Sequence, residues 1–153
     1  MENAVGMDVP ATSRTPSHLW IVGILATLWT GFGCYDYVMT QTKNVAYLEM
    51  MGGPDLVAYL TSFPAWAVAF WAIGVWGSLL GSLFLLARSH RAVMLYGASI
   101  VGLLVTTIYQ FGISNPPPAM MTPGMLTMSV IVWVVAIGLF AYARIMAARG
   151  VLR

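Results

Sequence analysis

The stretch Pro64–Ala87, with the sequence PAWAVAFWAIGVWGSLLGSLFLLA, contains no charged residue. A helix needs about 20 predominantly apolar residues to cross the hydrocarbon core of a bilayer, so this stretch predicts a transmembrane helix. Residues 18–39, 92–112 and 124–146 predict three more. Each run is expected to be helical, because backbone groups in lipid have to form hydrogen bonds within their own segment. Transmembrane strands would need alternating apolar and polar residues, which these runs do not show.

The composition also indicates a membrane protein. Of the 153 residues, 59% are hydrophobic and 8% are charged, whereas soluble domains carry roughly 25% charged residues. The predicted fold is an all-α, integral membrane four-helix transmembrane bundle over residues 18–148, after a disordered cytoplasmic N-terminus over residues 1–17. The net charge of +2 is too small and too dispersed to indicate nucleic-acid binding.

The basic residues predict the orientation in the membrane. Six of them precede the first run, separate the second from the third, or lie at and after the end of the fourth: Arg14, Arg88, Arg91, Arg144, Arg149 and Arg153. The opposite side carries only Lys43. The positive-inside rule therefore places both termini in the cytoplasm, as in a multi-pass protein of the bacterial inner (plasma) membrane.

The connection between the first two runs, residues 40–63, is too apolar for a free loop. Gly52 and Gly53 predict the end of one short helix, and Pro54 suits the first position of another. These two helices are expected to lie at the membrane interface and to tie the first span to the second. An alternative is a lid over an outward-facing pocket.

Asp36 is the only acidic residue inside any of the four runs. A carboxylate at membrane depth is costly and usually has a partner or a function. Helical spacing places it on one face with Trp29, Phe32, Gly33, Thr40 and Lys43, and this face reaches Asn44 and Tyr47 if the helix continues. Because the predicted helix ends close behind Asp36, the carboxylate is expected near the outer surface.

Other polar and aromatic residues are predicted at the same depth. The candidate substrate-binding residues are Asp36, Tyr37, Trp66, Tyr109 and Gln110. A carboxylate beside aromatic rings suits sugars, through hydrogen bonds to hydroxyls, or cations, through cation–π contacts. The alternative is structural: Asp36 would bond to Thr40, to a tyrosine hydroxyl or to Gln110, and would orient two helices.

The second run carries small residues at helical spacing, namely Gly74, Gly77, Ser78 and Gly81. Small residues four apart let helices approach closely. This face is expected to pack inside the bundle, and a homodimer interface is the alternative.

No cofactor, metal site or catalytic centre is predicted. The single cysteine, Cys34, excludes an internal disulfide and a CxxC redox motif. His18 and His90 lie at the cytoplasmic helix ends, which disfavours a bis-histidine haem. The methionines near the start of the fourth run could bind Cu(I), but flexible packing is the favoured interpretation. The sequence shows no phosphate-binding loop and no nucleophile–base pair, so an enzyme is not expected.

Several segments between Trp20 and Phe111 resemble a known group of proteins. These segments are Asp36-Tyr37-Val38-Met39-Thr40, Tyr47-Leu48, Phe63-Pro64-Ala65-Trp66-Ala67, Gly74-Val75-Trp76-Gly77-Ser78-Leu79-Leu80-Gly81 and Tyr109-Gln110. The chain is similar there to a group of small, mostly uncharacterised four-span bacterial inner-membrane proteins, some of which are labelled sugar transporters. The resemblance implies the four-span architecture, and it implies that Asp36-Tyr37 and Phe63–Trp66 belong to a recurring design.

Two functions are compatible with this sequence. The first is a small-solute transporter or binding protein, for a polar solute such as a sugar, with an outward-facing polar and aromatic site. The second is a non-catalytic accessory or scaffold subunit of a larger membrane complex. The expected partners are the lipid bilayer, a small polar solute, and further copies of the chain or another membrane protein.

Overall fold

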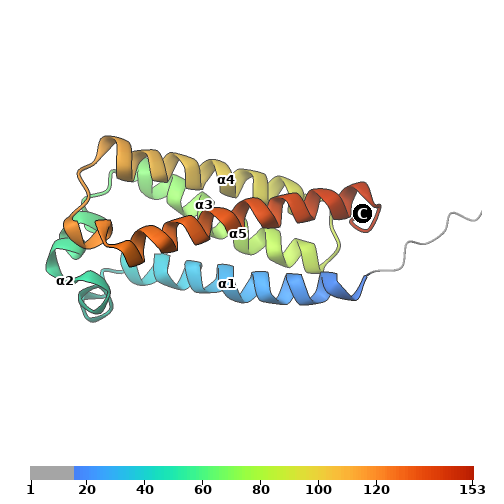
Figure 1. Cartoon of the computed structure of the whole chain (residues 1–153), viewed down its shortest axis with the longest axis horizontal. Coiled ribbons are helices and arrows are strands. Elements are labelled where there is room, and N and C mark those ends of the chain that lie inside the picture. Colours follow the sequence, from blue (N-terminus) through green and yellow to red (C-terminus); the bar gives the residue numbers. More distant parts are fainter. Residues whose placement is uncertain (1–15) are drawn as a thin grey trace, which may run out of the picture.

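The computed structural model describes residues 16–153, which form helices and connecting turns and contain no strand. The four long helices are α1 (Ser17–Gln41), α3 (Ala65–Leu86), α4 (Arg91–Ile108) and α5 (Pro123–Ala148). They run alongside one another (Figure 1), and each is long and apolar enough to cross a membrane, α4 together with the turn that extends it to Ile113. The predicted all-α four-helix bundle is therefore confirmed, and it fits a multi-pass membrane protein.

The segment predicted to be disordered covers residues 1–17, and residues 1–15 of it lie outside the described residues. Pro16 is extended, with φ −68° and ψ 137°, and Ser17 is the first residue of α1. The first helix thus begins one residue before the predicted start at residue 18, with Pro16 in the N-cap position.

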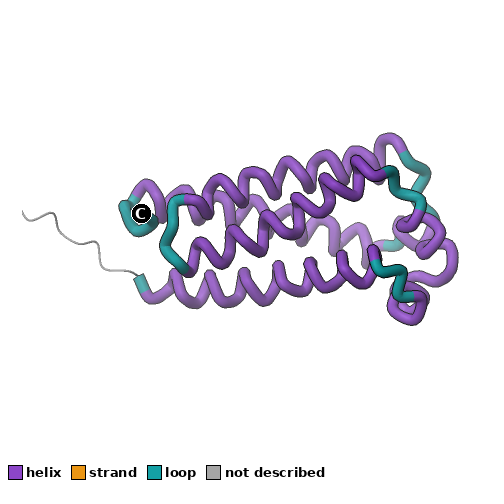
Figure 2. Tube along the Cα trace, turned by 180° about the vertical axis from the view of Figure 1, so that it is seen from behind, coloured by secondary structure: helices purple, strands orange, loops and turns teal. Residues whose placement is uncertain are grey.

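The bundle has two distinct ends (Figures 1 and 2). The start of α1, the turn between α3 and α4, and the end of α5 lie together and form what we call the base. The opposite end, which we call the α2 end, carries α2 (Val45–Thr61), a π-helical turn (Tyr109–Ile113) that extends α4, and a 3-10 turn (Pro118–Met121).

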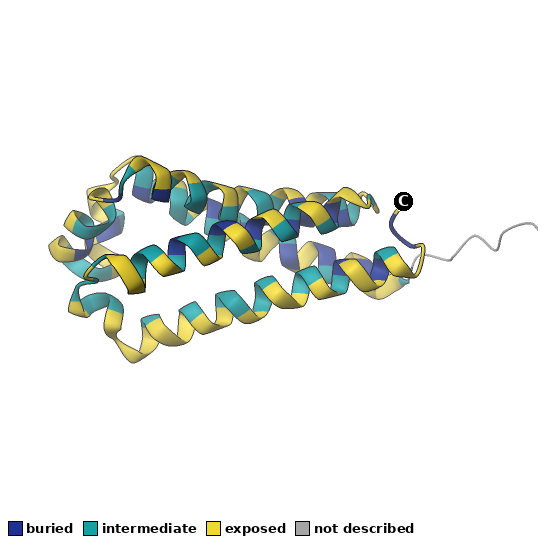
Figure 3. Cartoon of the chain, turned by 90° about the horizontal axis from the view of Figure 1, so that it is seen from above, coloured by how far each residue is buried: buried dark blue, intermediate teal, exposed yellow. Residues whose placement is uncertain are grey.

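The base holds the largest buried cluster of apolar side chains. Its members come from all four long helices and from the segment after α5, and they are Leu19, Leu85, Ala92, Tyr96, Ala143, Met146, Val151 and Leu152. Gly150, with φ +68°, turns the chain back after α5. The amide of Arg153 then donates to the Arg88 carbonyl at 2.7 Å, and the His90 amide donates to the Arg153 carbonyl at 2.9 Å. These bonds fasten the segment after α5 to the α3–α4 turn, where Figure 3 shows it buried.

Helices α3 and α4 approach each other most closely through glycine. A Cβ atom on Gly102 would lie 2.5 Å from the Phe70 carbonyl oxygen and 2.6 Å from the Gly74 nitrogen. A Cβ atom on Gly77 would lie 3.3 Å from the Leu95 carbonyl oxygen, and one on Gly81 would lie 3.0 Å from the Tyr96 ring. The predicted packing glycines therefore face α4 within the chain.

Helix α5 is anchored at one end. Its buried residues are Ala143 and Met146, both in its last turns at the base. Its residues nearer the α2 end are half-buried or exposed.

The predicted break in residues 40–63 is present inside α2. Gly53 has φ 77° and ψ −174°, a left-handed conformation that favours glycine. Pro54 follows it and begins the second half of the helix. The connection between α1 and α3 thus contains two short helical segments joined at Gly53.

Candidate functional site

A cavity of about 360 Å³ lies within the bundle, between the four long helices and below α2. Its lower wall includes Tyr96, which is 1% exposed, and Leu139, which packs against the core cluster of the base. Its upper wall includes Met51 of α2 and Met120 of the 3-10 turn. The cavity therefore extends from the α2 end to about the level of Tyr96, and the base closes it below.

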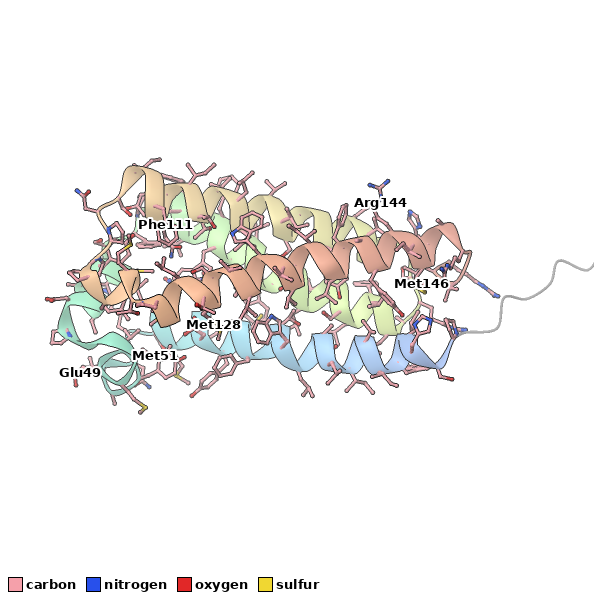
Figure 4. The ribbon with its side chains drawn as sticks, viewed as in Figure 1. Glu49, Met51, Phe111, Met128, Arg144 and Met146 are labelled. Atoms are coloured by element: carbon pink, nitrogen blue, oxygen red, sulfur yellow. The ribbon has the colours of Figure 1, made fainter. Side chains whose placement is uncertain are left out.

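The cavity reaches the surface near the α2 end. Phe32 of α1, Met51 of α2 and Met128 of α5 line it and are exposed. Figure 4 shows Met51 and Met128 at this end of the molecule. An entrance at this place opens sideways, between α1 and α5 and under α2.

The predicted face of α1 forms one wall. Trp29, Phe32, Gly33 and Asp36 all line the cavity, as their helical spacing suggests. Thr40 is buried, and its hydroxyl donates to the backbone carbonyl of Asp36 at 2.9 Å. Thr40 therefore leaves the Asp36 carboxylate free for other partners.

The Asp36 carboxylate has a partner on α2. The Tyr47 hydroxyl donates to Asp36 Oδ1 at 2.8 Å. The geometry follows from the local sequence: Lys43 adopts a positive φ of 53° in the turn, and the Asn44 side chain caps α2 by accepting the Tyr47 amide at 3.1 Å. The turn and the cap direct Tyr47 back toward α1, where its ring also meets Tyr35 edge-on, with 5.8 Å between centroids.

The environment of Tyr47 keeps its hydroxyl protonated. Burial raises the pKa of Tyr47 above its usual range, and the hydrogen bond to Asp36 and the charge of Asp36 raise this pKa further. The phenol is therefore a stable hydrogen-bond donor at neutral pH, which suits it to hold a carboxylate.

The other end of α2 is attached to the π-helical turn. The Tyr59 hydroxyl lies 2.5 Å from Ser114 Oγ and donates to the Gln110 carbonyl at 3.4 Å. Burial raises the pKa of Tyr59, so this hydroxyl also stays protonated. Each half of α2 is thus fastened to a different long helix, the first to α1 and the second to the extension of α4.

The five predicted site residues fall into two groups. Asp36 and Gln110 line the cavity. Tyr37, Trp66 and Tyr109 are not among its lining residues and belong to an aromatic cluster at the α2 end.

The aromatic cluster is a chain of edge-to-face and tilted contacts. Tyr37 meets Trp71 with 5.2 Å between ring centroids, and Trp71 meets Phe63 at 6.0 Å. Tyr109 contacts Phe63 at 4.9 Å and Trp66 at 5.2 Å. Trp71 also lines the cavity. The cluster therefore joins α1, α3 and the end of α4, and it supports one wall of the cavity through Trp71.

A buried hydroxyl network in the lower part of the bundle was not predicted. Tyr96 lies 2.9 Å from Ser82 Oγ, and Ser82 lies 3.4 Å from Thr30 Oγ1. These residues belong to α4, α3 and α1. Each of the three carries a hydroxyl inside an apolar run, and this sequence signal could have indicated an interior position, because polar side chains in membrane spans usually face the bundle interior.

The described residues offer no cluster of three histidine, cysteine, aspartate or glutamate side chains that could hold a metal. Of the methionines near the start of α5, Met120, Met125 and Met128 line the cavity, together with Met51. Thioether side chains are flexible and polarisable, so these residues give the upper cavity an adaptable apolar wall.

Protein-family models, curated proteins and solved structures were compared with the chain, and none of them matches it.

Proposed function

We propose that this protein binds a small solute in the cavity and acts as a solute carrier of the bacterial inner membrane. The observation that supports the proposal best is the placement of Asp36. It lies in the wall of a mainly apolar cavity that reaches the surface, and its carboxylate is positioned by Tyr47. Pockets of this size, mainly apolar with a few placed polar groups, are typical of small-molecule sites.

The arrangement of charges supports the proposed orientation. Arg88, Arg91, Arg144, Arg149 and Arg153 lie at or near the base, and Lys43 lies at the α2 end. With the base in the cytoplasm, the cavity entrance opens toward the outer half of the bilayer. The resemblance of the Asp36–Thr40 and Phe63–Ala67 segments to four-span inner-membrane proteins agrees with this location.

The experiment is a binding measurement on the protein reconstituted in lipid nanodiscs. Ala136 lines the cavity, and Ala141 is an exposed residue on the same helix. We expect Ala136→Phe to fill the cavity and to abolish saturable binding of small amphiphilic probes, and Ala141→Phe to leave it intact. If Ala136→Phe binds every probe as Ala141→Phe does, the cavity is not the binding site and the proposal fails.

The second candidate function is an accessory subunit of a membrane complex, and the weak anchoring of α5 favours it. Because α5 is buried only near the base, a helix of a partner protein could insert between α1 and α5. Purification in mild detergent discriminates the two functions. A fixed, stoichiometric partner that protects Met128 from oxidation would favour the subunit, whereas a protein that binds probes without a partner would favour the carrier.

A further inference from the structure

We propose that the cavity selects a small organic ammonium ion with an apolar body, and that the ammonium group pairs with Asp36. This inference rests on the proposed solute-binding function and names the chemical class of the solute. It follows from the charges, the hydrogen-bonding groups and the rings that line the cavity.

The lining side chains carry one formal charge. Asp36 is the only acidic residue among them, and no lysine or arginine of the described chain is present in the lining. Within the described residues the carboxylate forms no ion pair, and its hydrogen-bond donor is Tyr47, at Oδ1. The second carboxylate oxygen is therefore available to a ligand. In an apolar cavity, attraction between opposite charges is much stronger than in water, so the site favours a cation over a neutral solute.

The hydroxyl groups of the cavity act as acceptors. Six serine and threonine side chains line it: Thr30, Ser78, Ser99, Thr106, Thr107 and Ser129. Each of them donates its proton to a helix carbonyl oxygen, at distances of 2.6 to 3.1 Å. A hydroxyl has one proton and two lone pairs, so each group retains only acceptor capacity toward a ligand.

The Tyr96 hydroxyl is committed in the same way. Ser82 donates its proton to the Ser78 carbonyl at 2.9 Å. The 2.9 Å contact between Ser82 and Tyr96 therefore uses the proton of Tyr96. This phenol, too, has no proton to offer to a solute.

Few donors remain. They are the Gln110 amide and the indole N–H groups of Trp29, Trp71 and Trp133. A sugar presents many hydroxyls that each donate and accept, and burying such a group without enough hydrogen-bond partners is unfavourable. An ammonium ion only donates, so an acceptor-rich cavity satisfies it.

The remaining walls suit the apolar body of such an ion. The three indole rings and the phenyl rings of Phe32 and Phe111 line the cavity, and aromatic faces attract cations. The methionines of the upper wall can adapt to the shape of an alkyl or aryl group. The chemistry of the lining therefore favours an arylalkyl or alkyl amine over a sugar or an organic anion.

The test compares four probes on the nanodisc-embedded protein by the change in tryptophan fluorescence. The probes are 2-phenylethylamine, its neutral analogue 2-phenylethanol, the anion 3-phenylpropionate, and glucose. The signal of Ala136→Phe is subtracted to remove partition into lipid. We expect the amine to bind at least about tenfold more tightly than the alcohol, a difference of about 1.4 kcal/mol, and we expect no saturable binding of the anion or of glucose.

Asp36→Asn tests the assigned counter-ion, and Asp36→Glu is the matched control that retains the charge. We expect Asp36→Asn to lower the affinity for the amine to that for the alcohol, and Asp36→Glu to keep most of the preference. Equal binding of amine and alcohol by the wild-type protein would overturn the cation assignment while leaving the solute-binding function intact. Tighter binding of glucose than of the amine would also overturn the cation assignment and leave the solute-binding function intact. Absence of saturable binding by all four probes would overturn both.

Discussion

Tyr47 lies eleven residues after Asp36, and its hydroxyl donates to Asp36 Oδ1 at 2.8 Å. This hydrogen bond joins the first half of α2 to α1 beside the cavity entrance. Its removal by Tyr47→Phe is expected to lower the free energy of unfolding by about 1 kcal/mol, the usual net value of one hydrogen bond. Amide hydrogen exchange should become faster in residues 45–52, and exchange in α3 and α4 should not change.

The matched control for Tyr47→Phe is Tyr35→Phe. Tyr35 touches the Tyr47 ring edge-on, and among the described residues no hydrogen bond is formed by its side chain. We expect Tyr35→Phe to leave exchange in α2 nearly unchanged. Equal acceleration by the two variants would mean that ring packing, and not the hydrogen bond to Asp36, holds α2 in place.

Tyr47 of α2 should ionise at a higher pH than an ordinary tyrosine. The pKa of Tyr47 is raised, chiefly by burial and further by Asp36. Because the folded-state pKa exceeds the unfolded value near 10, the contribution of this group to stability is complete below about pH 10 and is lost as the pH rises toward the folded-state value. In an absorbance titration of tyrosinate, Tyr47→Phe should remove amplitude well above about pH 10. Loss of amplitude at or below that pH would contradict the assignment.

The close approach of α3 and α4 should not tolerate a methyl group. Gly102→Ala places its Cβ 2.5 Å from the Phe70 carbonyl oxygen. We expect the two helices to separate, at a cost of about 1–3 kcal/mol. The measurement is thermal unfolding in detergent, followed by circular dichroism.

Gly138→Ala is the matched control for Gly102→Ala. Gly138 lies in the middle of α5, and a Cβ built there meets no atom within 4 Å. Since alanine favours helix over glycine by about 1 kcal/mol, this variant should be as stable as the wild-type protein or slightly more stable. A similar loss of stability in both variants would show that the close α3–α4 contact does not cause the loss in Gly102→Ala.

The orientation can be tested by cysteine labelling. With Cys34→Ser as background, Asn115→Cys introduces a thiol at the α2 end and Ala87→Cys introduces one at the base; both positions are exposed. In intact cells with a permeable outer membrane, a membrane-impermeant maleimide should label Asn115→Cys, while Ala87→Cys should react only after lysis. The reverse pattern would place the base outside and would contradict the positive-inside assignment.

The sequence predicted the helices well and the site in part. The four spans follow from hydropathy, the break at Gly53 follows from glycine and proline chemistry, and the cavity-facing side of α1 follows from the helical period. All three are local properties of the sequence. The helical period likewise places Asp36 on the side of α1 that lines the cavity. Its bond to Tyr47 was only one of several open alternatives, because it depends on the direction in which the chain leaves the turn at Lys43.

The predicted convergence of Tyr37, Trp66 and Tyr109 with Asp36 rested on their common depth and not on the helix faces that carry them. Leu103, Thr106, Thr107 and Gln110 line the cavity at ordinary helical spacing. Tyr109 falls beside that face and packs against Phe63 and Trp66. A common depth does not determine which side chains point into a cavity. The donor and acceptor roles of the cavity hydroxyls likewise depend on atomic distances that no sequence pattern contains.

The one-sided attachment of α5 has a mechanical consequence. Helices α1, α3 and α4 are joined by close glycine contacts and by side-chain hydrogen bonds at several levels, whereas α5 is held by Ala143, Met146 and the segment that follows it. Displacement in a tilting rigid helix grows with distance from its fixed end. A small tilt of α5 about the base therefore displaces Met125 and Met128 farther than any residue near Met146. The volume available to a solute can therefore change by a rigid swing of a single helix, without any rearrangement of the other three.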